Sequence, residues 1–504
     1  MARNPMTDPA PNIVIGLDIG TTSTMGVAVR LPGEILAVAR RPANLISRKP
    51  GWAEEDPEEW WRNSCEILRE ITAAIDGAQL AGICATGMLP AVVLLDAAGK
   101  LLRPSIQQSD GRCGAEVDEL RRQNDEAAFL KRTGNGINQQ LVAAKLRWIA
   151  AHEPEIFSRI GTVFGSYDFI NWRLTGVRAV EQNWALEAGF TDIATDAIAD
   201  DLVDLAGIAR AAVPQRSVSH QGMGTISAAA SAATGLPEGL PVFGGAADHI
   251  VSALAAGINQ AGDVLLKFGG AGDIVVASDK AVPDARLYLD YHLIPGLYAP
   301  NGCMASSGTA LNWLTTLLPT PAGTNSPHQA FDALANDVAP GADGLICLPY
   351  FLGEKTPIHD PMARGAFVGL TLLHTPAHLW RATLEAVAFG FRHHIEVLKD
   401  MGHVPKRFMA SDGGTASRVW MQIVADVLGA PVQLLENAYG SAVGAAFVAA
   451  IGAGLTDDWG AVSKLSRYGE LVQPSDERHK AYNQIYPRYR QLYQVLAPYF
   501  HGGN

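Results

Sequence analysis

Asp18 lies in surroundings that suit phosphate chemistry. It follows the apolar run 13–17 and is itself followed by Ile19 and by Gly20-Thr21-Thr22. A carboxylate can hold Mg²⁺, which takes one or two carboxylates plus phosphate oxygens, and the N–H groups of a glycine-rich turn can wrap phosphate. An ordinary hairpin turn is the structural alternative, because Asp, Gly and Thr are common in turns.

Asp248 is the second candidate, at the end of the segment Gly244-Gly245-Ala246-Ala247-Asp248. An aspartate at the edge of a cleft could accept the proton of an attacking hydroxyl and so act as a general base. The alternative is that Asp248 caps the helix-like segment 250–257. The local sequence leaves both interpretations open.

Two more glycine-rich segments could contact a nucleotide. The backbone donors of Gly269 and Gly270 could cradle a phosphate, although a plain hairpin turn is the alternative. Gly413-Gly414-Thr415 follows the apolar run 408–410, and glycines there would let the backbone approach a flat ring closely. A strand-to-helix loop is the alternative for this segment.

The elements that must position these residues occur in two similar cycles. In each cycle, apolar runs separated by glycine-rich turns predict a strand hairpin, and a helix with a proline in its first turn follows later. The first cycle has strands expected at 13–17, 25–30 and 35–40, further strands at 80–85 and 91–95, and a helix that begins at Asp56-Pro57; the second has strands expected at 241–245 and 288–293, a hairpin at 263–277, and a helix that begins at Thr375-Pro376.

Strands followed by helices, twice over, predict an α/β protein of two domains with an internal duplication. The Pro- and Gly-containing segment 236–241 is the expected boundary, which gives domains 1–241 and 242–504. This division assigns Asp18 and Asp248 to different domains. Small-molecule sites commonly lie between domains, so we expect a central cleft.

The composition narrows the function classes. The 504 residues include 39 Lys and Arg against 51 Asp and Glu, a formal net charge of −12. Nucleic-acid and anionic-membrane surfaces need basic patches, so we expect neither partner.

Five scattered cysteines without Cys-x-x-Cys spacing disfavour a disulfide framework or zinc site and favour the cytoplasm. The first ten residues lack the apolar core of a signal peptide, and the Gly- and Ala-rich stretch 439–455 predicts tight packing rather than a membrane span.

Several common catalytic signatures are absent from the sequence. It contains no Gly-x4-Gly-Lys-Ser/Thr, no Gly-x-Gly-x-x-Gly after the first strand, no His-Glu-x-x-His and no Gly-x-Ser-x-Gly. P-loop NTPases, simple Rossmann enzymes, zinc proteases and α/β-hydrolases are therefore disfavoured.

Taken together and in order, the motifs resemble those of the FGGY carbohydrate kinases, within the actin–hexokinase–heat-shock ATPase superfamily. The resemblance runs from about residue 13 to about residue 454. It implies two ribonuclease H-like (actin-like ATPase) domains, an N-terminal sugar-binding lobe and a C-terminal nucleotide-binding lobe. It is carried by Asp18–Thr22, Pro50-Gly51-Trp52 with Trp60-Trp61, Lys145–Trp148, Ser166–Gly176, Gly353–Pro357 and Gly413–Ser417.

The resemblance implies transfer of the γ-phosphoryl group of Mg-ATP to a sugar hydroxyl. In this interpretation Asp248 is the base, Asp18 holds Mg²⁺ through water, and Asp248 is a second carboxylate near the metal. A homodimer is common in the family. The phosphate-binding residues would be Gly20, Thr21, Thr22, Gly269 and Gly270, and the adenosine would lie against Gly413, Gly414 and Thr415.

Within the family, the segments 101–106 and 109–112 look most like those of xylulokinases, which phosphorylate D-xylulose to D-xylulose 5-phosphate. Met88, Gln108 and Asp110 occupy expected sugar-binding positions. The sequence departs from the pattern where Met88 lacks a following His, where Gln108 replaces Trp, and where Gly270 replaces Thr.

Three alternatives remain open. The first is a kinase of the same fold for another ketose or polyol, such as ribulose or erythritol. The second is a chaperone-like or filament-forming relative, although such proteins lack the Pro-Gly-Trp and Gly-Glu-Lys-Thr-Pro stretches of this chain. The third is a non-catalytic sugar or nucleotide sensor, for which Gly270 is the motive.

Overall fold

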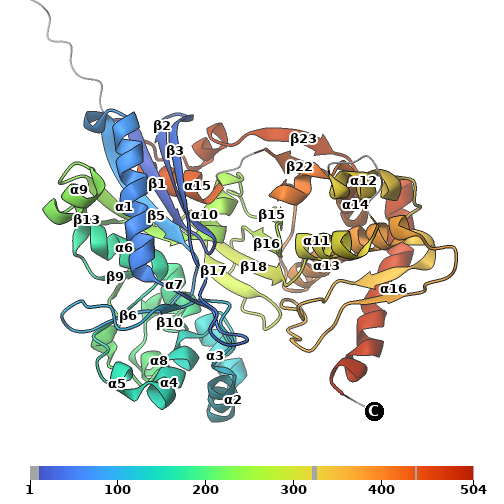
Figure 1. Ribbon diagram of the computed structural model, residues 1–504, viewed down its shortest axis with the longest axis horizontal. Coiled ribbons are helices and arrows are strands. Elements are labelled where there is room, and N and C mark those ends of the chain that lie inside the picture. Colours follow the sequence, from blue (N-terminus) through green and yellow to red (C-terminus); the bar gives the residue numbers. More distant parts are fainter. Residues whose placement is uncertain (1–10, 320–325, 437–439, 503–504) are drawn as a thin grey trace, which may run out of the picture. The chain divides into compact units, whose positions relative to one another are not determined.

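The structure is a computed structural model that describes residues 11–319, 326–436 and 440–502. These residues form two compact units. The first unit comprises residues 11–257 together with 290–296 and 440–465, and the second comprises 258–289, 297–319, 326–436 and 466–502. Each unit contains a mixed sheet covered by helices (Figure 1).

The sheet of the first unit has the strand order β13-β14-β5-β1-β2-β3. Strands β1, β2 and β3 form an antiparallel meander, β5 and β14 run parallel to β1, and β13 is an antiparallel edge. The bounds are β1 (Ile13–Ile19), β2 (Ser23–Arg30), β3 (Glu34–Pro42), β5 (Leu80–Gly87), β13 (Gly222–Thr225) and β14 (Pro241–Ala247).

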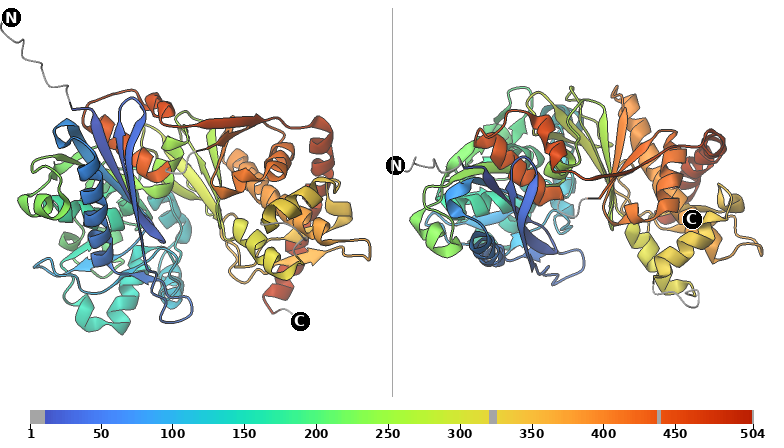
Figure 2. Two further views of the ribbon diagram at one scale, coloured as in Figure 1. Left: turned by 45° about the horizontal axis from the view of Figure 1, so that its top comes forward. Right: turned by 90° about the horizontal axis from the view of Figure 1, so that it is seen from above.

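Helices α1 (Pro57–Ala74) and α15 (Gly440–Gly452) cover opposite faces of this sheet (Figure 2). A Cβ on Gly26 of β2 would meet side chains of α1, whereas a Cβ on Gly16 of β1 would lie 1.9 Å from the carbonyl oxygen of Ala442 in α15. The small residues of α15 therefore allow contact between backbones. The tight packing expected for 439–455 is confirmed from residue 440 on, while Tyr439 lies outside the described residues.

The expected start of α1 is also confirmed. The carboxylate of Asp56 accepts a hydrogen bond from the N–H of Glu58 at 3.0 Å, and Pro57 is the first helical residue. By contrast, the strand expected at 91–95 is β6 (Val93–Leu95), which pairs with β8 and not with the main sheet. The other elements of the first unit are β4 (Glu54–Glu55), β7 (Ser105–Ile106), α2 (Gly114–Gln123), α3 (Glu126–Thr133), α4 (Val142–His152), α5 (Pro154–Phe157), β8 (Thr162–Phe164), α6 (Ser166–Thr175), β9 (Ala179–Glu181), α7 (Gln182–Glu187), β10 (Thr191–Asp192), β11 (Ala197–Ile198), α8 (Asp200–Asp204), β12 (Gln215–Ser217), α9 (Ala228–Thr234) and α10 (Asp248–Ala255).

The boundary expected at 241/242 differs from the one in the structure. Strand β14 pairs with β5, so its hydrogen bonds hold it and the following helix α10 in the first unit. Residues 290–296 and 440–465 also belong to this unit. Asp18 and Asp248 therefore belong to the same unit, and the assignment of these two residues to different domains was wrong.

The sheet of the second unit repeats the order of the first. Its strands are arranged β17-β18-β16-β15-β21-β22-β23, with a meander of β15, β16 and β18, two parallel strands β21 and β22, and the antiparallel strand β23. This repeat confirms the internal duplication. The strand expected as third in the meander, 288–293, is instead β17, outside β18. The bounds are β15 (Asp263–Phe268), β16 (Gly272–Val276), β17 (Tyr288–Tyr291), β18 (Tyr298–Met304), β21 (Arg407–Ser411), β22 (Val432–Leu435) and β23 (Tyr468–Val472).

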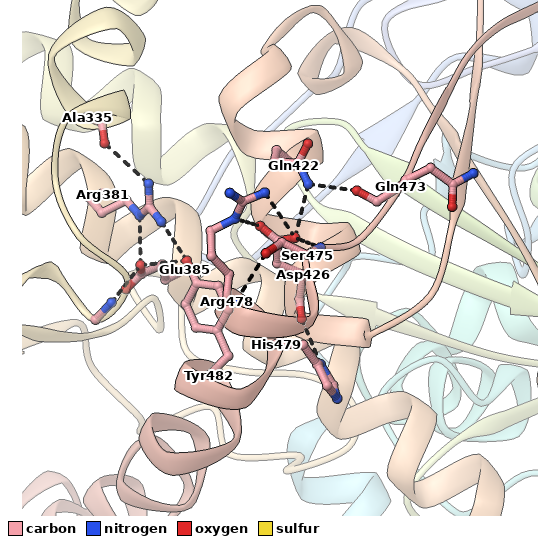
Figure 3. Close-up of polar contacts among 11 residues, drawn as sticks. Ala335, Arg381, Glu385, Gln422, Asp426, Gln473, Ser475, Arg478, His479 and Tyr482 are labelled. Carbon is pink, nitrogen blue, oxygen red and sulfur yellow. Dashed lines mark hydrogen bonds and ion pairs between the residues drawn. The ribbon is translucent and has the colours of Figure 1, made fainter.

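Buried polar contacts join the long helices of the second unit (Figure 3). Arg381 pairs with Glu385 at 2.7 Å, and both side chains hydrogen-bond with the Tyr482 hydroxyl. Arg478 pairs with Asp426. These contacts connect α16 to α13 and α14. The helices and the small hairpin of this unit are α11 (Gly308–Leu317), α12 (Pro327–Asn336), α13 (Pro376–Asp400), α14 (Arg418–Leu428), α16 (Asp476–Phe500), β19 (Ile346–Leu348) and β20 (Ala366–Val368).

A cavity of about 280 Å³ lies beside this network, and none of the predicted site residues lines it. Across the described part of the chain, none of the helices has both the length and the apolar composition that crossing a bilayer requires.

Candidate active site

The carboxyl ends of three parallel strands bring Asp18 and Asp248 to one edge of the first sheet. Asp18 on β1 pairs with Thr86 on β5, and Thr86 pairs with Ala246 on β14. The Thr86 hydroxyl also donates a hydrogen bond to the Ala246 carbonyl at 2.6 Å. With about 4.8 Å between strands, the Cα atoms of Asp18 and Ala246 are about 10 Å apart, and Asp248 is two residues further on.

Residues 20–22 form the turn between β1 and β2. The Gly20 N–H donates to the Ser23 carbonyl at 3.1 Å, which closes a tight hairpin. Thr21 and Thr22 are both exposed on this turn. The hairpin interpretation is therefore correct, and the two threonines are still available to a phosphate.

Asp248 is the first residue of α10, and its neighbour His249 contacts it directly. The carboxylate oxygen Oδ1 accepts the His249 N–H at 2.6 Å and lies 3.3 Å from His249 Nδ1, while His249 Nε2 lies 2.8 Å from Asp290 Oδ2. Burial lowers the pKa of His249, but the hydrogen bonds to Asp248 and Asp290 outweigh it and raise this pKa well above its usual range.

Glu187 completes this cluster. Burial, and then the charge of Asp290, raise the pKa of Glu187 well above its usual range. One ligand atom from each of Glu187, His249 and Asp290 lies within 4.8 Å of the others, close enough to share a divalent cation. A proton shared by the two carboxyl groups also accounts for their close approach.

The glycine turn of the second unit packs against the start of α11. The carbonyl of Gly269 accepts the Gly308 N–H at 2.9 Å, and the carbonyl of Gly270 accepts the Ser307 N–H at 2.8 Å and the Thr309 N–H at 3.1 Å. This is a hairpin turn between β15 and β16, supported by a helix.

Thr309 stands beside Gly270, where the resemblance described above leads us to expect a threonine. A Cβ on Gly270 would lie 3.1 Å from the Thr309 hydroxyl oxygen. Thr309 therefore places a hydroxyl next to the site of the missing one. No sequence pattern indicates this residue, because the contact depends on how α11 packs on the turn.

The predicted adenosine loop lies at the same edge of the second sheet. β15 and β21 are parallel, with Lys267 opposite Ser411, so both glycine-rich loops follow the carboxyl ends of adjacent strands. A Cβ on Gly414 would lie 2.5 Å from the Cβ of Phe268, whereas a Cβ on Gly413 would meet nothing within 4 Å. Gly414 is thus required by packing, and Gly413 leaves open space for a ring. The Thr415 hydroxyl donates to the Asp412 carbonyl at 2.7 Å.

The predicted sugar-binding residues lie on two loops of the first unit. Met88 directly follows β5 and is buried, and Gln108 is half-buried. The ammonium of Lys145 donates to the carbonyls of Pro90 at 3.3 Å and Gln107 at 2.8 Å. Lys145, which belongs to the motif Lys145–Trp148, therefore joins the two loops.

Asp110 is fully buried in an ion-pair network. Arg112 donates to both of its carboxylate oxygens, at 2.8 Å and 2.7 Å, and the Ala53 N–H donates at 2.6 Å. Burial alone would raise the pKa of Asp110, but these hydrogen bonds and the Arg112 charge lower it. The Arg112 guanidinium lies 3.8 Å from the ring centroid of Trp52. Asp110 thus organises the loop that carries Trp52.

Glu187 and Asp290 carry no recognisable sequence signal. Each is a single charged residue inside an otherwise unremarkable segment, and only the fold brings it to a neighbour with which it interacts. The sequence does predict the aspartates and glycine loops, because each follows the end of an apolar strand.

Comparison with known proteins identifies the family of this chain. The family model for the N-terminal domain of the FGGY carbohydrate kinases matches residues 13–255, and the C-terminal model matches 270–453. The xylulose kinase of Bacillus subtilis (strain 168) is 27% identical over 488 residues, covering 95% of this chain and 96% of that protein. The xylulose kinase of Escherichia coli (strain K12) is 28% identical over 490 residues, covering 96% and 99%.

Solved structures show the same similarity. The xylulose kinase from Rhodospirillum rubrum is 61% identical, with a TM-score of 0.93 over 97% of this chain and 100% of that one. Plasmodium falciparum glycerol kinase, at 19% identity, shares the fold with a TM-score of 0.86 over 96% and 99%. The expected fold of two actin-like ATPase domains is therefore confirmed, and the chain belongs to the FGGY family of carbohydrate kinases.

Proposed function

We propose that this carbohydrate kinase transfers the γ-phosphoryl group of ATP to a hydroxyl of D-xylulose, giving D-xylulose 5-phosphate and ADP. The observation that carries the proposal is the 61% identity, over 97% of the chain, to the xylulose kinase from Rhodospirillum rubrum. Asp18 and Asp248 at one sheet edge supply the carboxylates that the reaction needs.

Asp248 accepts the proton of the attacking hydroxyl. Its side chain is 37% exposed at the start of α10, so a substrate hydroxyl can reach it. As the proton moves to Asp248, the sugar oxygen bonds to the γ-phosphorus and the bond to the bridging oxygen of ADP breaks. Phosphoryl transfer depends mostly on positioning and charge neutralisation, so one carboxylate and several N–H donors suffice.

The carboxylates of Asp18 and Asp248 fit Mg²⁺, since this ion prefers oxygen ligands and binds through one or two carboxylates together with phosphate oxygens. Asp18 would hold the ion through water. When bound, Mg²⁺ neutralises charge on the β- and γ-phosphates.

The remaining site residues bind and orient. Gly20, Thr21, Thr22, Gly269 and Gly270 would offer donors to phosphate oxygens, with the Thr309 hydroxyl beside Gly270. The adenosine would lie against Gly413, with Gly414 and Thr415 shaping the loop. For the sugar, Met88 and Gln108 would make direct contacts, and Asp110 would act through Arg112 and Trp52.

A panel of sugars with coupled ADP detection tests the proposal. We expect D-xylulose to give the highest kcat/KM. A second candidate is a kinase for another ketose, a polyol or a sugar acid, because the gluconate kinase from Lactobacillus acidophilus is 25% identical with a TM-score of 0.91, covering 98% of this chain and 99% of that one. Higher kcat/KM with gluconate, ribulose or erythritol would favour this candidate. Tight sugar binding without any formation of ADP would instead indicate a non-catalytic sensor.

We also propose a homodimer in the cytoplasm. Leu372 and Leu373 are 105% and 85% exposed, as expected for residues covered by another protein surface. All five cysteines are free, which suits a reducing compartment. Light scattering of the double variant Leu372→Asp, Leu373→Asp should give a monomer mass. An unchanged dimer mass would place the interface elsewhere, and a monomeric wild-type protein would contradict the dimer itself.

A further inference from the structure

A series of neighbouring polar side chains ends at the aspartate proposed as the base. We call Asp248, His249, Asp290 and Glu187 the side-chain relay. His249 Nδ1 lies 3.3 Å from Asp248 Oδ1, His249 Nε2 lies 2.8 Å from Asp290 Oδ2, and a carboxylate oxygen of Glu187 lies within 4.8 Å of one of Asp290. The steps of phosphoryl transfer described above use Asp248 alone, so they leave the other three residues unexplained.

Two hydrogen bonds from one asparagine side chain to the backbone of residue 291 position the far end of the relay. The side-chain amide of Asn183 donates to the Tyr291 carbonyl at 3.0 Å, and its oxygen accepts the Tyr291 N–H at 2.7 Å. Asn183 is fully buried on α7, and Glu187 lies four residues later on the same helix face. These two hydrogen bonds to residue 291 therefore also place Asp290 beside Glu187.

The near end of the relay sets the orientation of Asp248. Two donors of residue 249, the main-chain N–H at 2.6 Å and the ring at 3.3 Å, reach the same oxygen, Oδ1. The ring cannot rotate freely, because Asp290 holds its other nitrogen and the Asp290 side chain is fully buried. Because the fixed ring holds one oxygen of the Asp248 carboxylate, the carboxylate cannot rotate freely. Its second oxygen therefore points in a fixed direction.

We propose that His249 is a positioning residue which, together with Asp290 and Glu187, orients the Asp248 carboxylate toward the hydroxyl that it deprotonates. This inference rests on the proposed function, since it gives Asp248 the proton of the sugar hydroxyl. The relay moves no proton itself. It contributes because a general base must lie within hydrogen-bond reach of its proton, and a misplacement of about 1 Å can cost about a hundredfold in rate.

The first experiment measures kcat and the KM values for D-xylulose and ATP in His249→Ala, His249→Asn and Asp290→Asn. We expect His249→Ala to lower kcat between about tenfold and a hundredfold, with the KM for ATP unchanged. The amide of His249→Asn can donate to Asp248 but is too short to bridge to Asp290, so it should restore only part of the loss. Asp290→Asn should lower kcat in the same direction. His328→Ala, which removes a histidine bonded to Asn312 in the second unit, is the matched control and should retain wild-type kcat.

A double-variant test separates positioning from other roles. If His249 acts through Asp248, adding His249→Ala to Asp248→Asn should lower the residual kcat less than about twofold, because residues that act as one unit are non-additive. A further loss as large as that of the single variant would overturn the proposal. So would a loss of D-xylulose affinity in calorimetry that matches the loss of kcat/KM, since His249 would then be a sugar contact.

The outcomes also distinguish this inference from the proposed function. If Asp248→Asn loses turnover while both His249→Ala and Asp290→Asn keep it, the positioning role is wrong and the base assignment stands. If Asp248→Asn itself keeps wild-type turnover, the base assignment is wrong. Melting temperatures show whether a variant fails to fold. If His249→Ala does not fold, the kcat of Asp290→Asn tests the positioning role in its place.

Discussion

Replacing Arg112 with Gln should destabilise the first unit far more than an exposed arginine substitution would. Arg112 donates to both oxygens of Asp110 and lies 2.8 Å from Glu54, and the side chains of all three are at most 3% exposed. The variant leaves the buried Asp110 carboxylate without the cation that pairs with it, while Glu54 keeps its ion pair with Arg103. It also removes the guanidinium that stacks 3.8 Å from the Trp52 ring centroid.

These contacts set the size of the effect. Removing one partner of a buried ion pair costs about 3–5 kcal/mol, and a desolvated cation–π contact contributes up to about 2 kcal/mol. Because neighbouring contributions are not additive, we expect a loss of about 4 kcal/mol in the free energy of unfolding. At about 2–4 °C per kcal/mol, this corresponds to a fall of about 8–16 °C in Tm.

Thermal and urea denaturation, followed by tryptophan fluorescence, would measure the change. Arg62→Gln is the matched control, since Arg62 pairs with Asp56 at 3.3 Å while its side chain is 61% exposed, and exposed pairs contribute at most about 1 kcal/mol. If Arg112→Gln lowers Tm no more than Arg62→Gln does, the buried network does not stabilise the sugar-binding loop. In that case Asp110 would be better placed among the direct sugar contacts.

Three further predictions test other parts of the molecule. Asp248→Asn should lower kcat at least about a hundredfold with nearly unchanged ATP affinity, and wild-type turnover would show that the base is misassigned. Gly16→Ala places a Cβ 1.9 Å from a backbone oxygen of α15 and should cost about 1–3 kcal/mol or more in chemical denaturation; a cost no larger than that of Gly114→Ala, where a Cβ meets nothing within 4 Å, would contradict this packing. Burial raises the pKa of Glu55 to about 8, so its contribution to stability is present below its unfolded pKa of about 4.3 and is lost as pH rises toward 8. Glu55→Gln should therefore gain Tm relative to the wild type between pH 5 and pH 8, whereas a constant difference would mean that Glu55 is ionised in the folded state.

Much of the fold could be predicted from local sequence patterns. The apolar runs at 13–17 and 263–277 predict buried strands, and Asp56-Pro57 and Thr375-Pro376 predict helix starts that the structure confirms in α1 and α13. These signals are local, because capping and strand burial depend on residues a few positions apart. The glycine-rich ends of the strands likewise predicted where the candidate site lies.

Sequence patterns failed where partners are far apart in the chain. The boundary at 241/242 was wrong because β14 pairs with β5, some 160 residues earlier, as the Thr86–Ala246 hydrogen bond shows. The strand at 288–293 was given the wrong place in the meander for the same reason. No local signal says which strand a given apolar run will pair with.

The sequence by itself therefore determined the family, the two α/β cycles and the aspartates and glycines that follow the strands, since each depends on the order of residues along the chain. Only the tertiary structure decided that Asp18 and Asp248 share a sheet edge, that Asp110 is bound by Arg112, that Thr309 stands beside Gly270, and that His249 links Asp248 to Asp290. Each of these contacts joins segments whose approach depends on strand pairing and side-chain packing over the whole unit. The free energy of such contacts depends on burial and on the distance between the groups. Neither quantity can be read from the residues that neighbour each group in the sequence.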